Sequence, residues 1–188
     1  MKTNAKSLVA LAAAITLGLG FTSCSKDEPK PDPEPTPETT FNISLWLSSE
    51  IIEYYDIDMQ YTDADGKVVS VNIKDCPEST KEIPVNDNAD LVTIRTFSAE
   101  CKSNKLPTET SIMVKYTYNG NVPADDINVA VGGSFLINGV GNNDFFRYFK
   151  GIEAKNLEGM GQYLNETFGT WILKVDAEGN KTYTLGHE

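Results

Sequence analysis

Residues 55–73 read YDIDMQYTDADGKVVSVNI, and this stretch decides the fold class. Large apolar side chains alternate with Asp and Gln before the turn, which is the period-two pattern of a half-buried strand. The segment Asp63-Ala64-Asp65-Gly66 predicts a three-residue hairpin loop with Gly66 in the left-handed conformation. The predicted register pairs Tyr61 with Val69, Met59 with Val71 and Ile57 with Ile73. Because two alternations agree through one turn, the sequence predicts an antiparallel hairpin.

The same alternation recurs along the rest of the chain. It predicts strands over residues 41–47, 90–97, 110–119, 127–137, 170–175 and 181–185, with a short edge strand over 81–85. Gly132-Gly133 predicts a bulge or a crossing between sheets. The last two strands form a second hairpin, whose register pairs Trp171 with Leu185 and Leu173 with Tyr183.

Two short helices are expected before that last hairpin. Asn142-Asn143-Asp144 can cap a helix bearing Phe145, Phe146, Tyr148 and Phe149, and residues 157–168 place Leu157, Met160, Leu164 and Phe168 near one face. The predicted fold is therefore a mainly β, antiparallel sandwich. In architecture it resembles immunoglobulin-like or transthyretin-like modules, a likeness that assigns no activity.

The first 23 residues have the features of a secretory leader. Lys2 and Lys6 form a positive start, and residues 8–20 are an uncharged apolar run. That run is too short for a comfortable membrane span and suits a signal-peptide core. It ends in Phe21-Thr22-Ser23-Cys24, with two small residues before the cysteine.

This ending resembles the lipobox of bacterial lipoproteins, with Phe21 where Leu is usual. The resemblance implies that Cys24 becomes the acylated N-terminus, and more than one acyl chain gives stable anchoring. Ser25-Lys26-Asp27-Glu28 resembles the short signal after the cysteine in surface-exposed lipoproteins of the Bacteroidota. The resemblance places the protein at the outer membrane, anchored by lipid and exposed on the cell surface.

A tether and one domain follow. Prolines at every second position from 29 to 37 favour an extended rod, so residues 24–40 can hold a single domain over 41–188 up to about 50 Å from the lipid. As an alternative, a proline-rich run can be a docking peptide. Loss of Lys2 and Lys6 makes the formal net charge of −11 two units more negative. Such a charge disfavours nucleic-acid partners.

Few motifs for catalysis or cofactor binding are present. His187 is the only histidine, so a histidine-based triad or a multi-imidazole zinc site lacks its parts. The Asp-x-Asp-Gly at residues 63–66 begins like a calcium loop, but no further acid follows to complete it. Gly139-Val140-Gly141 has Asp144 where a nucleotide-binding turn needs a third glycine. We expect no cofactor, no metal and no nucleotide.

Two cysteines remain once Cys24 is acylated. In an oxidising envelope Cys76 and Cys101 can form a disulfide that closes a long loop, worth about 3 to 4 kcal/mol on the loop-entropy model. The alternative is a pair of unbonded structural thiols.

The candidate binding surface comes from a predicted hairpin between residues 41–47 and 51–61. With a turn at residues 48–50, Trp46 and Tyr54 share the outer face with Asp56 and Asp58. Exposed aromatic rings beside carboxylates suit the stacking and hydrogen bonding of a sugar. The alternative is that the region around residues 145–168 covers this face and buries the aromatics as a second small core.

Three functions fit these observations. The first is a non-enzymatic binding or accessory module of the cell envelope, whose partner is a glycan or an envelope protein. The second is a structural subunit of an envelope or pilus-like assembly. The third is a glycan hydrolase that uses two carboxylates facing one cleft.

Overall fold

The structure is a computed structural model, and it describes residues 38–85, 88–141 and 145–186. The predicted lipidation site Cys24, the proline-rich tether up to residue 37 and His187 lie outside the described residues.

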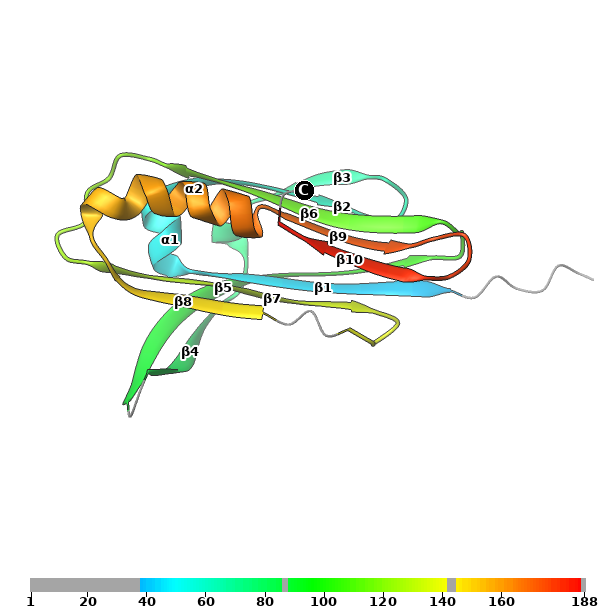
Figure 1. Ribbon diagram of the computed structural model, residues 1–188, viewed down its shortest axis with the longest axis horizontal. Coiled ribbons are helices and arrows are strands. Elements are labelled where there is room, and N and C mark those ends of the chain that lie inside the picture. Colours follow the sequence, from blue (N-terminus) through cyan, green and yellow to red (C-terminus); the bar gives the residue numbers. More distant parts are fainter. Residues whose placement is uncertain (1–37, 86–87, 142–144, 187–188) are drawn as a thin grey trace, which may run out of the picture. The chain divides into compact units, whose positions relative to one another are not determined.

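Two antiparallel five-stranded sheets face each other, so the predicted β-sandwich is confirmed (Figure 1). Sheet A has the strand order β4 (Glu78–Val85), β5 (Asn88–Ser103), β1 (Thr39–Ser48), β7 (Ile127–Ile137) and β8 (Phe145–Ile152). Sheet B has the order β10 (Lys181–Leu185), β9 (Thr170–Val175), β6 (Thr108–Tyr118), β2 (Tyr55–Thr62) and β3 (Val68–Val71). The chain passes between the sheets several times.

The core fills the space between the two sheets. Each strand sends alternate residues inward, as the period of two requires. The buried residues of sheet A include Phe41, Leu45, Val131 and Phe135. Those of sheet B include Met59, Ile112, Val114, Trp171 and Leu173. The rings of Phe135 and Trp171 stack across the gap with their centroids 4.4 Å apart. This burial supplies most of the stabilisation of the fold.

The hairpin over residues 55–71 is confirmed, with two of its three predicted pairs. Met59 pairs with Val71 and Tyr61 with Val69, and Gly66 has a φ of 79°. The expected third pair is wrong, because β3 ends at Val71 and Ile73 belongs to the 3-10 turn η1 (Ile73–Asp75). The side chain of Asn72 accepts a hydrogen bond from the backbone N–H of Lys74, which starts this turn.

The predicted hairpin between the first two strands is wrong. Residues 49–54 form the short helix α1 (Ser49–Tyr54), which carries the chain from β1 in sheet A to β2 in sheet B. Ile51 and Ile52 on this helix are buried in the core. In the sequence, a six-residue helix with two apolar residues has the same pattern as a short turn followed by the start of a strand. Alternation alone therefore does not reveal that the chain crosses from one sheet to the other here.

Residues 145–149 lie in strand β8, and not in the predicted helix. The aromatic run is apolar on both faces because Phe145 and Phe149 pack on the main core while Phe146 and Tyr148 pack on a second cluster behind sheet A. The capping segment 142–144 lies outside the described residues. The second predicted helix is confirmed as α2 (Leu157–Phe168), which follows the 3-10 turn η2 (Ala154–Asn156).

The two glycines of β7 mark neither a bulge nor a crossing. Gly132 and Gly133 pair in register with β1 and β8. A Cβ atom on Gly132 would lie 1.7 Å from the ring of Trp46, so the glycine leaves space for an aromatic side chain. The last hairpin, in contrast, has the predicted register, with Trp171 opposite Leu185 and Leu173 opposite Tyr183.

Candidate functional site

The structure separates the residues of the predicted binding surface. Trp46 lies on the outer face of sheet A, whereas Asp56 and Asp58 lie exposed on the outer face of sheet B. Tyr54 ends α1 and packs against the main core. The shared aromatic and acidic surface therefore does not exist, because helix α1 puts β1 and β2 into different sheets.

Trp46 belongs to a second small apolar cluster, which includes Phe146 and Tyr148 from the region that the alternative interpretation named but does not include Tyr54. The centroid of the Trp46 ring lies 5.2 Å from that of Phe146. The ammonium group of Lys81, a residue of β4, lies 3.8 Å from the centroid of the Trp46 ring. The cluster is completed by Ile83, Val92, Ile94 and Ala130, which are all buried. The Trp46 ring is therefore half-buried, with the Lys81 ammonium over one of its faces.

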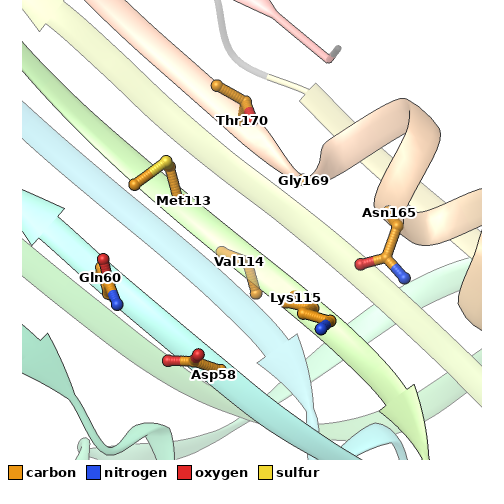
Figure 2. Close-up of a pocket in the computed structure, with 8 residues that line it drawn as sticks. All are labelled: Asp58, Gln60, Met113, Val114, Lys115, Asn165, Gly169 and Thr170. Carbon is orange, nitrogen blue, oxygen red and sulfur yellow. The ribbon is translucent and has the colours of Figure 1, made fainter.

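Asp58 does line a pocket, but the other lining residues are not those that the sequence predicts. The pocket has a volume of about 420 Å³ and opens on the outer face of sheet B. Figure 2 shows its lining residues on three neighbouring strands and on the end of α2. They are Asp58, Gln60, Met113, Val114, Lys115, Asn165, Gly169 and Thr170.

The strand register fixes the layout of this pocket. Asp58 on β2 is opposite Lys115 on β6, Gln60 is opposite Met113, and Met113 is opposite Thr170 on β9. Opposite side chains on one face lie about 5 Å apart. The pocket therefore has an apolar centre, Met113, whose side chain is 46% exposed, with polar side chains around it.

The pocket exists because strand β9 begins part-way along β6. Beyond Met113, α2 takes the place of a strand beside β6. The side-chain amide of Asn165 accepts a hydrogen bond from the backbone N–H of Tyr116 at 2.8 Å. The same amide donates a hydrogen bond to the backbone carbonyl of Tyr116 at 2.8 Å. The backbone N–H of Val114 donates to the carbonyl of Gly169 at 2.8 Å. These bonds satisfy the edge of β6 and leave a step in the surface between helix and sheet.

The pocket offers hydrogen-bonding groups of both kinds. A carboxylate only accepts hydrogen bonds when ionised, an ammonium only donates, and an amide or hydroxyl does both. The Lys115 ammonium and the Asp58 carboxylate point away from each other (Figure 2). Among the described residues, the ion pairs do not include Asp58 with Lys115. Both charged groups are therefore available to a bound molecule.

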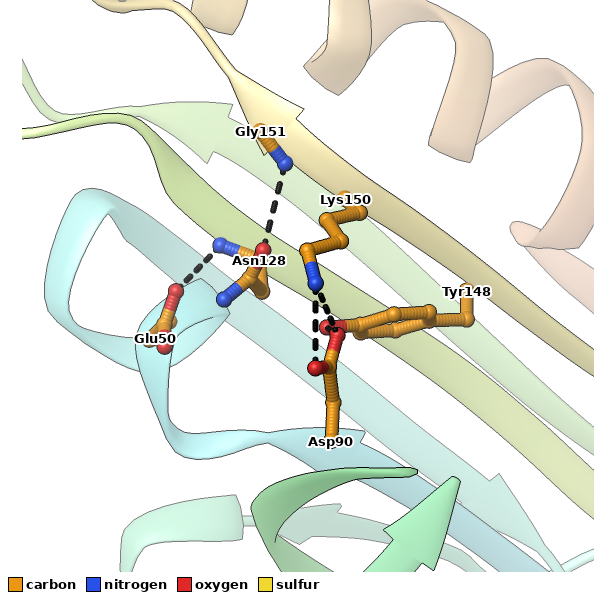
Figure 3. A network of polar contacts seen from close by, with 6 residues as sticks. All are labelled: Glu50, Asp90, Asn128, Tyr148, Lys150 and Gly151. Carbon is orange, nitrogen blue, oxygen red and sulfur yellow. Dashed lines mark hydrogen bonds and ion pairs between the residues drawn. The ribbon is translucent and has the colours of Figure 1, made fainter. Parts of the chain in front are cut away.

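Two other carboxylates, in contrast, are used to hold the fold (Figure 3). Asp90 on β5 accepts hydrogen bonds from the Tyr148 hydroxyl at 2.7 Å and from the Lys150 ammonium at 3.0 Å on β8. These bonds hold the pKa of the Asp90 carboxyl below its usual range, Lys150 contributing most. The β4–β5 hairpin extends past the end of β1. The two hydrogen bonds of Asp90 connect this hairpin to β8 across the outer face of sheet A.

Glu50 fastens helix α1 in a similar way. Its carboxylate accepts a hydrogen bond from the backbone N–H of Asn128, where the register between β7 and β8 shifts (Figure 3). The Asn128 side chain in turn accepts a hydrogen bond from the backbone N–H of Gly151 at 3.1 Å. An irregular strand leaves backbone groups without ladder partners, and these two side chains supply them.

The predicted disulfide is not formed, and both Cys76 and Cys101 are free thiols. The backbone N–H of Thr96 on β5 bonds the carbonyl of Pro77, so Cys76 lies near Thr96. Cys101 is five residues farther along the same strand, which is about 17 Å at 3.4 Å per residue. A disulfide needs Cα atoms within about 7 Å.

No metal site stands out in the part of the chain that the structure describes. There, no group of three or more His, Cys, Asp or Glu side chains is placed to hold a metal ion. In the suspected calcium loop, the Asp63 carboxylate instead accepts hydrogen bonds from the backbone N–H groups of Asp65 and Lys67. The helices among the described residues are also too short and polar to cross a membrane.

Sequence reasoning found part of this pocket and missed the rest. The alternation in residues 55–61 and 110–119 assigns Asp58, Gln60, Met113 and Lys115 to outer faces. It does not say that β2 and β6 are neighbours, because strand order depends on contacts distant in sequence. Thr170 and Asn165 carried no signal of their own. Comparison with protein-family models, with curated proteins and with solved structures found no match for this chain.

Proposed function

We propose that this protein is a cell-envelope lipoprotein, anchored through Cys24 at the outer membrane, whose β-sandwich binds a glycan without catalysing a reaction. The observation that supports glycan binding is the pocket on sheet B, where the exposed Met113 lies among polar side chains. Five polar side chains line the pocket, and all but Asn165, which bonds the backbone of Tyr116, are free to meet a ligand. A sugar ring has an apolar C–H face and hydroxyl groups around its rim. Such a ring matches a pocket with an apolar floor and polar walls.

The compartment supports the same proposal. The leader, the lipobox-like ending at Cys24 and the alternating prolines fit a domain held outside the inner membrane. Glycans are abundant ligands there.

The binding arrangement fits the pocket better than hydrolysis does. Hydrolysis of a glycosidic bond uses two carboxyl groups facing one cleft at about 5 to 10 Å. Asp58 is the one acid that lines the pocket. Glu50 and Asp90 are engaged by backbone and side-chain donors on the other sheet.

The experiment is a glycan-array measurement with the chain from residue 24 on, in which Cys24→Ser prevents acylation. We expect binding to a subset of glycans, and a loss of about tenfold or more in affinity for Asp58→Asn and for Lys115→Gln, since each loses a charge-assisted hydrogen bond. Asp56→Asn is the matched control, because Asp56 is exposed on the same face of β2 and does not line the pocket. Equal loss in all three variants would contradict the site.

An assembly subunit is the second candidate, and strand β3 favours it. It is an edge strand of sheet B, and Val68 and Val69 on it are 56% and 38% exposed. Exposed apolar edges can pair with a strand of another chain. Sedimentation of the same protein over a range of concentrations tests this: association that Val69→Lys abolishes supports it, and a monomer at all concentrations contradicts it.

A further inference from the structure

We infer that the sheet B pocket selects uncharged sugar rings over anionic ones and seats the ring on Met113. This inference rests on the proposed function and adds the class of ligand and its orientation.

The orientation follows from the arrangement of the three strands. Met113 lies between Gln60 on one neighbouring strand and Thr170 on the other, with Lys115 two residues along β6. Side chains two residues apart on one face of a strand are separated by about 7 Å, and those on neighbouring strands by about 5 Å. A ring lying flat over the thioether therefore has an amide, a hydroxyl, an ammonium and a carboxylate around its rim.

The number of polar groups also favours a sugar over a zwitterionic ligand such as an amino acid. An amino acid uses Asp58 for its ammonium and Lys115 for its carboxylate, and leaves Gln60 and Thr170 without a role. A sugar ring has enough hydroxyls to use all four. Because amide and hydroxyl groups both donate and accept, they suit hydroxyls better than they suit charges.

The charge preference follows from the balance inside and outside the pocket. Asp58 and Lys115 cancel each other within the lining. Asp56 is exposed on the same face, and the whole chain has a formal net charge of −11. A carboxylate on the ligand therefore gains one cation and is repelled by Asp58, Asp56 and the net field. A neutral ring meets no such repulsion.

The experiment compares matched polysaccharides by affinity electrophoresis and titration calorimetry, with the Cys24→Ser chain from residue 24. The probes are neutral galactan and mannan, and polygalacturonate as the anionic partner of galactan. We expect a neutral probe to bind at least about tenfold more tightly than polygalacturonate at low salt. We also expect its affinity to change less than about twofold as the salt concentration rises from about 0.02 M to about 0.5 M.

Variants at Met113 test the orientation. Met113→Leu keeps an apolar side chain of similar volume, so we expect affinity within about twofold of the parent. Met113→Asp puts a charge under the ring, and we expect a loss of about tenfold or more. Because Met113 is 46% exposed, neither change disturbs the core, and circular dichroism checks the fold.

The outcomes separate this inference from the proposed function. If none of these probes and no array glycan binds, both are overturned. If polygalacturonate binds as tightly as galactan while Asp58→Asn still weakens binding, glycan binding holds and the charge preference is overturned. If Met113→Asp binds as well as the parent, the seating of the ring on Met113 is overturned.

Discussion

Replacing Gly132 by Ala should destabilise the protein through one identifiable clash. The added Cβ would lie 1.7 Å from Cζ3 and 1.8 Å from Cη2 of Trp46. The indole must then leave its position beside Phe146 and under Lys81. Overpacking of this kind costs about 1 to 3 kcal/mol, and a lost cation–π contact about 0.5 to 1 kcal/mol more. We therefore expect the free energy of unfolding to fall by about 2 to 4 kcal/mol.

The assay is urea unfolding followed by circular dichroism, which does not depend on the tryptophan signal. A Leu side chain at position 46 ends before the ring atoms that clash. In a Trp46→Leu background, Gly132→Ala should therefore cost less than about 1 kcal/mol, so the two changes are coupled by at least about 1 kcal/mol.

Gly159→Ala is the matched control, because it makes the same chemical change inside helix α2 with no atom within 4 Å of the new Cβ. It should stabilise the protein by about 0.5 to 1 kcal/mol. A Gly132→Ala protein within 0.5 kcal/mol of the parent, or strictly additive effects with Trp46→Leu, would refute the reasoning.

Three further predictions concern single contacts. Asn165→Leu removes both hydrogen bonds to the backbone of Tyr116 and should lower the free energy of unfolding by about 2 to 4 kcal/mol. Asn165→Asp keeps the acceptor oxygen, so its free energy of unfolding should lie between those of Asn165→Leu and the parent. Cys76 and Cys101 should both react with a thiol reagent in urea without reductant; a protein in which neither reacts contradicts the free thiols. In the folded protein Cys76 should react slowly, since burial raises the pKa of its thiol. The pKa of Asp90 is lowered, so its contribution to stability is present above the unfolded-state pKa of about 3.9 and is lost as the pH falls through the folded-state pKa. The difference in urea midpoint between the parent and Asp90→Asn should therefore close on acidification, and a constant difference would contradict this.

A structural feature can be predicted from the sequence when the residues that cause it are close together in the chain. The turns at Gly66 and Gly179 need a left-handed residue, and the alternating strands on either side lock the register, so both hairpins could be predicted. The sequence favours a helix over residues 145–149 because an aromatic run that is half-buried on both faces has no period of two. The packing of Phe146 and Tyr148 on the outer face comes from the β4–β5 hairpin, which is distant in sequence.

The binding site shows the same limit. That Asp58 and Lys115 lie on outer faces follows from alternation alone. That they line one pocket depends on β2 pairing with β6 and on α2 taking the place of a strand beside β6. The predicted surface of Trp46, Tyr54, Asp56 and Asp58 failed at a single step, the helical turn of α1.

The sequence by itself determined the class of fold, the strands other than β8 and the two tight hairpins, and it predicts an exported, lipid-anchored chain. These depend on side-chain periodicity, turn stereochemistry and short signals, which act over a few residues. Only the tertiary structure decided the strand order, the second cluster around Trp46, the separation of Cys76 from Cys101 and the pocket around Met113. These depend on which sheet each strand joins, and that choice is made by burial of apolar surface between segments far apart in the chain.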